Sequence, residues 1–282
     1  MFSDSILKGK TILITGGSSG IGKEMGHRFA QLGARVAIIA RRKDLIDEVC
    51  KEMESYGFDF FGVQCDVRNP DQISDAYGKI TDEFGLPNVL VNNAAGNFIS
   101  PTEKLSTHAV DAVISIVLNG TLYSTIDMGK RWIENGNGGT ILNIVTTYSW
   151  TGSAFVVPSA AAKAGVLAVT RSLAVEWAKY GIRHVAIAPG PFPTEATRRN
   201  LSPLPGMDDV LKRRIPVGRF GNMDEITNLA AYLISDYASF INGEVVTIDG
   251  GEWLRGAGEF NDFSYLSLEE WEKIRKISTG KR

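Results

Sequence analysis

The feature that most constrains the fold is an apolar segment that runs directly into a glycine-rich turn and then into a helical pattern. The segment TILIT is followed at once by GGSSGIG, and helical periodicity begins at Lys23. Gly16 allows a tight turn, Gly20 lets the backbone approach a phosphate, and Gly22 lets helix and strand pack closely. The amino terminus of the helix attracts a pyrophosphate. The spacing predicts a dinucleotide site, although an ordinary tight turn between strand and helix would look the same in isolation.

The alternation of strand and helix continues along the chain. Short apolar runs alternate with longer segments of helical period, which predicts a parallel sheet with right-handed crossovers and helices on both faces. The seven predicted strands are 11–15, 35–40, 60–65, 88–93, 140–145, 183–188 and 244–249. The predicted helices cover 23–32, 44–56, 70–84, 108–133, 160–180 and 224–235.

Nothing in the sequence divides the chain into separate domains. It contains no internal repeat, low-complexity tract or linker, so residues 1–282 are expected to form one domain. The segment 193–221 is rich in Pro, Gly and Arg and lies between the sixth strand and the last crossover helix. We expect it to form a mobile lid over the substrate.

The C-terminal extension, residues 254–282, carries a helix signal of its own. Its SLEE segment has capping-box spacing, and Leu268, Trp271 and Ile274 share one helical face. We expect a short helix that packs back on the domain or on a neighbouring subunit.

Composition excludes several functional classes. A formal net charge of -2 gives no electrostatic reason to expect nucleic acid or a membrane as partner. Cys50 and Cys65 cannot form a disulfide framework, and the three histidines show no metal-ligand spacing, so we expect a reducing compartment and no metal. No secretory h-region, no run approaching about 18 apolar residues and no SKL-type terminus is present. The expectation is a cytoplasmic protein that binds small molecules and copies of itself.

The end of the second predicted strand indicates which dinucleotide binds. NAD sites usually carry Asp or Glu there, and this chain has Ala40, Arg41 and Arg42. A guanidinium matches a phosphate as a bidentate fork, and the hydroxyls of Ser18 and Ser19 could add donors. We therefore predict NADPH rather than NADH. The alternative is that the two arginines only begin a solvated helix.

Motifs along nearly the whole chain resemble those of the short-chain dehydrogenase/reductase family. They are TGGSSGIG, CDV at 65–67, NNAAG at 92–96, Asn119, Lys163, PGPFPT at 189–194 and DGG at 249–251. The resemblance implies a single-domain α/β Rossmann fold with a seven-stranded parallel sheet of order 3-2-1-4-5-6-7. Beyond the turn and the arginines, the cofactor-binding residues that it implies are Ile21, Asp66, Val67, Asn93, Lys163, Pro189, Gly190, Pro191, Phe192 and Thr194.

These residues have implied roles and plainer alternatives. By the resemblance, Asp66 and Val67 contact adenine, Asn93 lines the cofactor channel, and residues 189–194 hold the nicotinamide end. Taken singly, Asp66 could cap a helix, and Asn92 and Asn93 could form a turn at a strand end.

The catalytic pair departs from the usual family pattern. Most members carry YxxxK on a helix, whereas this chain has SAAAK, with Ser159 in place of the tyrosine before Lys163. Thr146 stands where the family generally has its serine. A generic alcohol dehydrogenase is therefore disfavoured.

One branch of the family, the 2,4-dienoyl-CoA reductases, shares this substitution and is very similar to this chain. The shared segments are NNAAGNFISPTEKLS, IVLNGT, TGSAFVVPSAAAKAGV, INGEVVTIDGGE and GEFND. In that branch the active-site tyrosine comes from the loop after the fifth strand, and Tyr148 stands at that position. Seen alone, Tyr148 could be a half-buried loop aromatic.

The relocated tyrosine suits the reduction of a conjugated thioester in the β-oxidation of unsaturated fatty acids. Hydride from NADPH would add to the δ-carbon of a 2,4-dienoyl-CoA, and the charge would reach the thioester oxygen as a dienolate. Tyr148 and Asn97 would form the oxyanion site. Protonation at the α-carbon, by an ordered water, would then give a 3-enoyl-CoA.

Three further catalytic roles follow from the resemblance. Lys163 would hold the nicotinamide ribose, Ser159 would hydrogen-bond within the same cluster, and Asn119 would bind a water linked to Lys163. The alternatives are a helix N-cap for Ser159 and a surface helix position for Asn119, although Asn is a poor residue inside a helix.

The resemblance also implies residues that contact the acyl-CoA. They are Arg68, Phe98 and Ser106, with Arg41 shared between cofactor and CoA phosphates. Plainer roles are a solvated helix start for Arg68, core packing for Phe98 and an N-cap for Ser106. In the lid, where relatives carry an Arg, this chain has Asn200, and Arg199 is the nearest substitute.

Two other functions and one assembly state stay open to test. The chain could reduce another enoyl thioester or a carbonyl with NADPH, or it could be an inactive NADPH-binding sensor. We also expect a homotetramer, because helices 108–133 and 160–180 carry more apolar residues than one buried face demands. These residues include Val113, Ile116, Val117, Leu167, Leu173 and Trp177, and burial within the monomer is the alternative.

Overall fold

The computed structural model describes residues 5–202 and 204–279, and the predictions for residues 1–4, 203 and 280–282 lie outside it. The described residues form one seven-stranded sheet of order β3-β2-β1-β4-β5-β6-β7, which confirms the predicted fold. Every neighbouring pair in the sheet is parallel. The strands are β1 (Thr11–Thr15), β2 (Arg35–Ala40), β3 (Phe60–Gln64), β4 (Val89–Asn92), β5 (Gly139–Ile144), β6 (Ile182–Pro189) and β7 (Val245–Ile248).

Burial explains why these strands lack polar alternation. All five residues of β1 are buried, because β2 and β4 pair with its two edges and helices cover both of its faces. A strand in this position needs apolar residues on both sides. Because all seven strands are parallel, their carboxyl ends lie at the same edge of the sheet. Parallel α/β folds bind their ligands at this edge.

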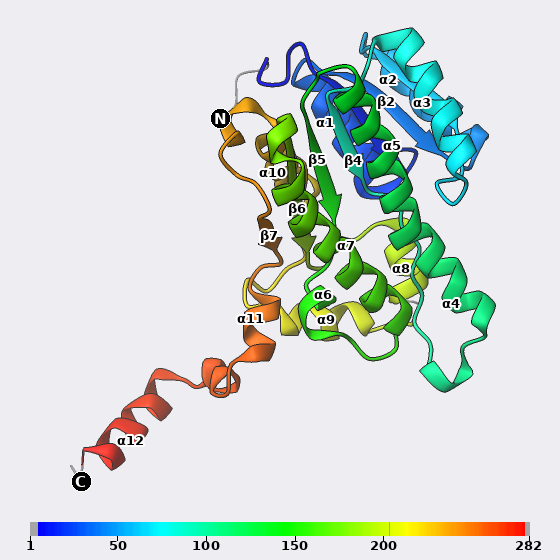
Figure 1. The fold of residues 1–282 in the computed structure, drawn as a ribbon. Coiled ribbons are helices and arrows are strands. Elements are labelled where there is room, and N and C mark those ends of the chain that lie inside the picture. The colour runs from blue at the N-terminus through cyan, green and yellow to red at the C-terminus, as the bar shows by residue number, and fades with distance from the viewer. Residues whose placement is uncertain (1–4, 203, 280–282) are drawn as a thin grey trace.

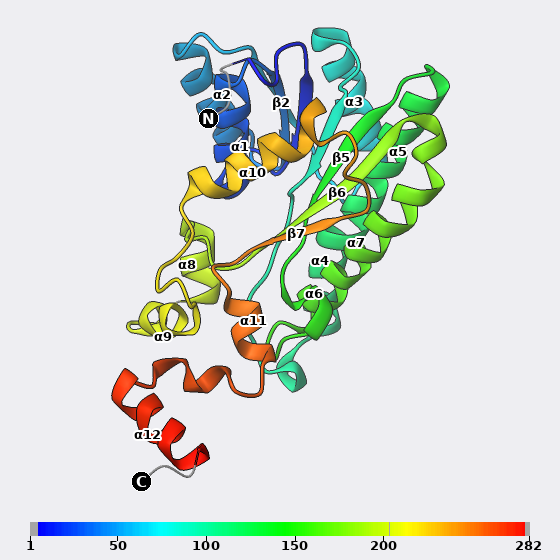
Figure 2. The same cartoon turned by 90° about the vertical axis from the view of Figure 1, so that its left-hand side faces the viewer.

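Helices cover the two faces of the sheet in separate layers, as Figure 2 shows. One apolar core lies under α1, α2 and α10, and another lies under α3 and α5. The helices are α1 (Gly20–Gln31), α2 (Lys43–Ser55), α3 (Pro70–Phe84), α4 (Thr107–Ile114), α5 (Gly120–Glu134), α6 (Tyr148–Thr151), α7 (Val157–Glu176), α8 (Glu195–Leu201), α9 (Met207–Arg214), α10 (Met223–Ile234), α11 (Glu252–Ala257) and α12 (Leu268–Ser278).

The predicted helix 108–133 is interrupted in the structure. A π-helical turn, Ser115–Asn119, joins α4 to α5. The whole span Thr107–Glu134 is long and apolar enough, by length and mean hydropathy alone, to cross a membrane, which the sequence analysis did not anticipate. Met128 and Trp132 of this span are fully or almost fully buried in the core against the sheet.

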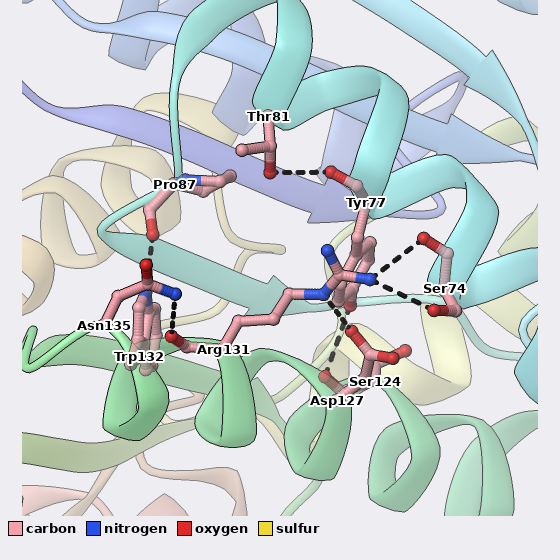
Figure 3. A network of polar contacts seen from close by, with 9 residues as sticks. All are labelled: Ser74, Tyr77, Thr81, Pro87, Ser124, Asp127, Arg131, Trp132 and Asn135. Carbon is pink, nitrogen blue, oxygen red and sulfur yellow. Dashed lines mark hydrogen bonds and ion pairs between the residues drawn. The ribbon is translucent and has the colours of Figure 1, made fainter.

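A polar cluster holds α3 against α5 (Figure 3). The Arg131 guanidinium donates to Asp127 on its own helix and to the backbone and hydroxyl oxygens of Ser74 on α3. The Cζ atom of the guanidinium also lies over the Tyr77 ring, 5.9 Å from the ring centroid. One side chain of α5 thus makes contacts with two residues of α3.

The C-terminal extension forms its helix but does not pack on the domain as expected. Ser267 and Glu270 form the predicted capping box at the start of α12. Every residue of α12 is exposed, and Figure 1 shows the segment extending away from the sheet. Packing back on the same chain is therefore wrong, and a neighbouring subunit is the alternative that remains. We call residues 258–279 the C-terminal arm.

Most of the apolar residues from which a tetramer was expected are buried within the single chain. Val113, Val117 and Leu167 are buried together inside the single chain, and Trp177 is buried in a second cluster with Ile116 and Leu173 packed against it. Val113, Val117, Leu167 and Trp177 are therefore covered within the monomer and do not by themselves indicate an interface, whereas Ile116 and Leu173 are only partly buried.

Candidate active site

The glycine-rich turn has the backbone geometry that a phosphate cradle needs. Gly16 and Gly20 have φ values of 69° and 55°, in the left-handed region that favours glycine. A Cβ at Gly22 would lie 2.5 Å from the Gly16 carbonyl oxygen, so Gly22 permits close packing within the turn itself. The Asn93 amide donates to the carbonyl oxygens of Thr15 and Gly16. Asn93 therefore holds the turn in shape, and the cradle suits the pyrophosphate of a dinucleotide at the amino terminus of α1.

Other residues of the turn have distinct surroundings. Ser18 is buried, and Ser19 is exposed at the N-cap of α1 without a side-chain capping bond. Ile21 packs against the core beneath α1. The two hydroxyls thus lie on the turn as predicted, and only that of Ser19 is exposed.

The predicted adenine end lies beside a hollow of about 490 Å³ that Arg41 and Asp66 line at the ends of β2 and β3. Arg42 takes the N-cap position of α2, and both arginines are exposed. A basic patch at this edge fits a dinucleotide that carries an additional phosphate on its adenosine ribose. Val67 is buried in the core below.

Asp66 does not cap a helix, because Asn69 caps α3 instead. The Asp66 carboxylate accepts hydrogen bonds from the Arg68 backbone and guanidinium, at 3.0 Å and 2.5 Å for the closest contacts of each. The Arg68 side-chain hydrogen bond is the main reason that the pKa of Asp66 lies below its usual value. Arg68 is therefore paired with Asp66, and its side chain is exposed.

The segment predicted to hold the nicotinamide end lies close to the glycine-rich turn. A Cβ at Gly20 would lie 3.4 Å from the Thr194 methyl carbon, so the start of the segment 193–221 borders the glycine-rich turn. Thr194 caps α8 through a capping box with Thr197. Phe192 is buried in the core, which leaves its backbone rather than its ring to face a cofactor. Gly190 donates its N–H to Ile248 of β7, which fixes the Pro189–Pro191 bend.

Three of the predicted catalytic residues form one continuous hydrogen-bonded row. The Asn97 amide nitrogen lies 3.2 Å from the Tyr148 hydroxyl oxygen, and that oxygen lies 3.1 Å from the Ser159 hydroxyl. Tyr148 begins the short helix α6 after β5, Ser159 lies in the first turn of α7, and Asn97 follows β4. Ser159 is buried inside the helix, so the alternative of an N-cap is wrong, and Val156 takes that position.

Lys163 lies one turn along α7 from Ser159 and is buried. Its ammonium group donates to the backbone carbonyl of Ile144 at the end of β5. Burial lowers the pKa of Lys163 to about 8. The side chain is thus a buried cation fixed at the strand ends, where it can hold a ribose hydroxyl.

Thr146 does not join the catalytic row. Its backbone N–H and hydroxyl face the Ser149 hydroxyl, at 3.3 Å and 3.5 Å. The position that usually supplies a catalytic serine in the family therefore shapes the α6 turn here.

Asn119 is the last residue of the π-helical turn between α4 and α5. It is half-buried, and within residues 5–202 and 204–279 its side chain has no hydrogen-bond partner. Single π turns inside helices occur often at functional sites, because they redirect one side chain without ending the helix. Asn119 is thus only partly exposed, and its amide has no protein partner among the described residues, which is what binding a water would require.

The predicted substrate residues lie at separate places on the same edge of the sheet. Phe98 is half-buried and packs against the core cluster beneath α4 and α7. Ser106 caps α4 by accepting a hydrogen bond from the Ala109 N–H, which confirms the plainer role without excluding a ligand contact. Arg199 is exposed on α8 and donates to Asn200.

Sequence reasoning missed several features of the site. The Ile144 carbonyl is a partner of Lys163 that only the tertiary fold supplies, and the Ser149 hydroxyl is a local partner of Thr146 within one turn. The π turn gives no distinct hydrophobic period. Phe155 adopts φ 65°, the one positive φ of a non-glycine residue in the part of the chain that the structure describes.

The chain is similar to known reductases and dehydrogenases over most of its length. A family model described as enoyl-(acyl carrier protein) reductase matches residues 16–252. A probable 2,4-dienoyl-CoA reductase of Bacillus subtilis, named as producing (2E)-enoyl-CoA, is 46% identical over 246 residues, 87% of this chain and 97% of that protein. A probable 2,4-dienoyl-CoA reductase of Caenorhabditis elegans, named as producing (3E)-enoyl-CoA, is 41% identical over 287 residues, 99% of this chain and 93% of that protein. A crystal structure of a short-chain dehydrogenase from Bacillus anthracis is 49% identical with a TM-score of 0.79, and the match covers 87% of this chain and 97% of that one.

Proposed function

The chain belongs to the short-chain dehydrogenase/reductase family, in its 2,4-dienoyl-CoA reductase branch, and from this we propose that it reduces 2,4-dienoyl-CoA to 3-enoyl-CoA with NADPH. Membership makes it an oxidoreductase with a nicotinamide cofactor. The relatives' names imply an acyl-CoA substrate and a place in β-oxidation. The choice of NADPH, the mechanism and the product are our proposal.

The observation that carries the proposal is the row of Asn97, Tyr148 and Ser159 beside Lys163. The family's tyrosine position in YxxxK is occupied by Ser159, so the only phenol in this row comes from α6. Asn97 and Ser159 both lie within hydrogen-bonding distance of its oxygen. If both donate to that oxygen, the single phenol proton is left for a substrate oxygen.

This arrangement suits an oxyanion that lies some carbons from the carbon that is reduced. NADPH, when bound, supplies the hydride that adds to the δ-carbon. The Tyr148 hydroxyl and the second Asn97 N–H then stabilise the negative charge that reaches the thioester oxygen. Lys163 holds the nicotinamide ribose and keeps the local field positive, and Asn119 holds the water linked to it. A water near Ser159 delivers the proton to the α-carbon.

Three observations support NADPH over NADH. Arg41 and Arg42 are both exposed at the end of β2, no carboxylate stands at that strand end to oppose a 2′-phosphate, and the hollow beside Arg41 is open to it. Asp66 and Asp75 also line this hollow, but Arg68 pairs with the Asp66 carboxylate and Lys79 adds a second cation to the lining. A comparison of kcat/KM for NADPH and NADH tests the choice, and equal values would contradict it.

The function is tested by following NADPH oxidation with 2,4-hexadienoyl-CoA and with a simple ketone. Turnover of the thioester but not of the ketone is expected, and the reverse preference would replace the proposal by a carbonyl reductase. NMR of the product distinguishes a 3-enoyl from a 2-enoyl thioester, the two products for which the bacterial and nematode relatives are named.

Tyr148→Phe is the variant that tests the mechanism. It removes one oxyanion donor and leaves the ring in place, so kcat should fall by roughly 10²–10³. The Kd for NADPH should change little, because Lys163 and the glycine-rich turn are untouched. Thr147→Ser, next to it in the chain, serves as the control. Unchanged turnover in Tyr148→Phe would remove the phenol from the mechanism.

We also propose a cytoplasmic homotetramer with a lid at residues 193–221. Cys50 and Cys65 are both free, which suits a reducing compartment. Burial raises the pKa of Cys65 to about 12 and that of Cys50 to about 11, so neither is a reactive thiolate at neutral pH. Cell fractionation tests the location, and recovery in an organelle fraction would contradict it.

A further inference from the structure

Phe155 lies in a conformation and an environment that its own side chain does not favour. Its φ of 65° is in the left-handed region, which disfavours a bulky side chain. The residue is 59% exposed, so core packing does not compensate for that strain. Gly or Asn would suit the backbone, and a polar residue would suit the exposure. Neither local conformation nor folding therefore accounts for an aromatic residue here.

The position of Phe155 relative to the catalytic row suggests what the ring contacts. The Phe155 carbonyl accepts a hydrogen bond from the Ser100 N–H at 2.9 Å. Three residues before Ser100, Asn97 bonds to Tyr148, so the same two loops are joined both at the catalytic row and at Phe155. Phe155 thus lies at the outer end of the pair of loops that holds the oxyanion donors.

Two further exposed apolar residues flank this junction. Ile99 is 41% exposed and Val157 is 44% exposed, and each is close in sequence to one partner of the Ser100–Phe155 bond. We call Ile99, Phe155 and Val157 the apolar rim. Exposed apolar residues that gather beside a polar site often mark a ligand surface. The backbone N–H of Ser100 and the carbonyl of Phe155 are already paired to each other, so the rim offers apolar surface rather than those polar groups.

We propose that Phe155 contacts the acyl chain of the substrate beyond the diene and sets the preference for chain length. This rests on the proposed function, because it takes an acyl-CoA as the ligand. The acyl chain is the part of that substrate that is both extended and wholly apolar, whereas the pantetheine arm carries amides that need hydrogen-bonding partners. The strained backbone of Phe155 holds the ring at the mouth of the site before substrate arrives.

The test compares binding of hexanoyl-CoA and decanoyl-CoA by calorimetry, using protein saturated with NADP⁺. Each buried methylene is worth about fourfold in affinity, so decanoyl-CoA should bind wild type at least about tenfold more tightly. Phe155→Ala should reduce that ratio to less than about threefold, chiefly by weakening decanoyl-CoA. Tyr56→Ala is the matched control, because Tyr56 is an aromatic residue that is 58% exposed and it caps α2, an element that Figure 1 shows well separated from α6.

A second variant separates the ring from the fold. Phe155→Gly suits the φ of 65° and should raise or keep the Tm while still losing the preference for decanoyl-CoA. The inference is overturned if either variant keeps the wild-type ratio, or if wild type shows no preference between the two thioesters. Because these thioesters are not reduced, binding is read independently of turnover. Failure of 2,4-hexadienoyl-CoA to oxidise NADPH would instead count against the proposed function.

A truncated thioester distinguishes the acyl chain from the pantetheine arm. The N-acetylcysteamine thioesters of the same two acids lack most of that arm. If Phe155 contacts the acyl chain, Phe155→Ala should lower the decanoyl preference in this series as well. An effect of the variant on CoA thioesters that disappears in the truncated series would overturn the assignment to the acyl chain.

Discussion

Lys163 is the residue whose charge state bears most directly on activity. Burial lowers its pKa to about 8, and its ammonium group lies against the Ile144 carbonyl. The proposed role needs a positive charge, and that charge is lost as the pH rises through the pKa. We therefore expect kcat/KM to fall above a pH of about 8. A profile recorded between pH 6.5 and 10 would contradict this if it stayed flat, and a Tm measured at each pH separates loss of activity from unfolding.

His184 is a buried histidine that has no evident place in the reaction. It is fully buried in β6 beside Trp177, and neither ring nitrogen has a hydrogen-bond partner within the described residues. Burial lowers the pKa of His184 to about 4, against about 6.5 in an unfolded chain. Between about pH 4 and about pH 6.5, His184 is therefore protonated in the unfolded state but neutral in the folded state.

The lower pKa of His184 in the folded state predicts that acid destabilises the protein. The free energy of unfolding should fall as the pH drops from about 6.5 to about 4, by up to about 3 kcal/mol from this residue. In His184→Leu, the free energy of unfolding measured with urea should depend less on pH over that interval, because leucine does not bind a proton. His108→Gln, at an exposed position, should keep the wild-type slope. An identical slope in His184→Leu would show that other groups govern acid stability.

At the scale of the elements, the sequence predicted the strands and crossover helices well. The seven strand ranges agree with the structure to within a residue or two, because a doubly covered parallel sheet needs uninterrupted apolar runs. The capping-box spacing also located the start of α12 at Ser267. Both signals are local, so they are readable without knowledge of the tertiary fold.

The elements that were missed depend on contacts between distant segments. The π turn at Ser115–Asn119 has no sequence period of its own, and α6 is too short to show one. The catalytic residues came from a family resemblance, whereas the row that joins Asn97, Tyr148 and Ser159 needs the loop after β4, helix α6 and helix α7 to meet. The predicted helix 108–133 has more apolar residues than one buried face needs, because this span contributes residues to two clusters, one against the sheet and one with α7.

The contact between α3 and α5 yields a prediction about stability without activity. Arg131→Met would remove the hydrogen bonds to Ser74 and leave Asp127 unpaired (Figure 3). We expect a loss of about 1–2 kcal/mol in the free energy of unfolding, with KM unchanged, because the cluster lies away from the catalytic row. Lys130→Met, at the neighbouring exposed position, is the control for removing a cation from α5. A raised KM in Arg131→Met would indicate that this contact also positions the site.

At the scale of the whole molecule, the C-terminal arm is the part that a single chain leaves uncovered. Leu268 and Ile277 of α12 are 88% and 81% exposed, and Trp271 is also exposed. Helix α11, which directly precedes the arm, does contact the domain. Its Trp253 packs on Trp150 of α6, two residues after Tyr148. Removal of the arm should therefore leave the catalytic row intact, provided that α11 is kept.

The final prediction is that the arm supports the proposed tetramer by covering its apolar face on a second copy. A chain that ends at Ala257 should stay folded, because every residue of α12 is exposed, but it should sediment at a lower mass than the full chain. Ile277→Asp should weaken assembly in the same direction, whereas Lys273→Asp on the same helix changes charge without removing apolar surface. Sedimentation velocity at micromolar protein distinguishes these cases. A monomeric full chain would refute the tetramer, and an unchanged mass after truncation would show that surfaces of the domain itself hold the copies together.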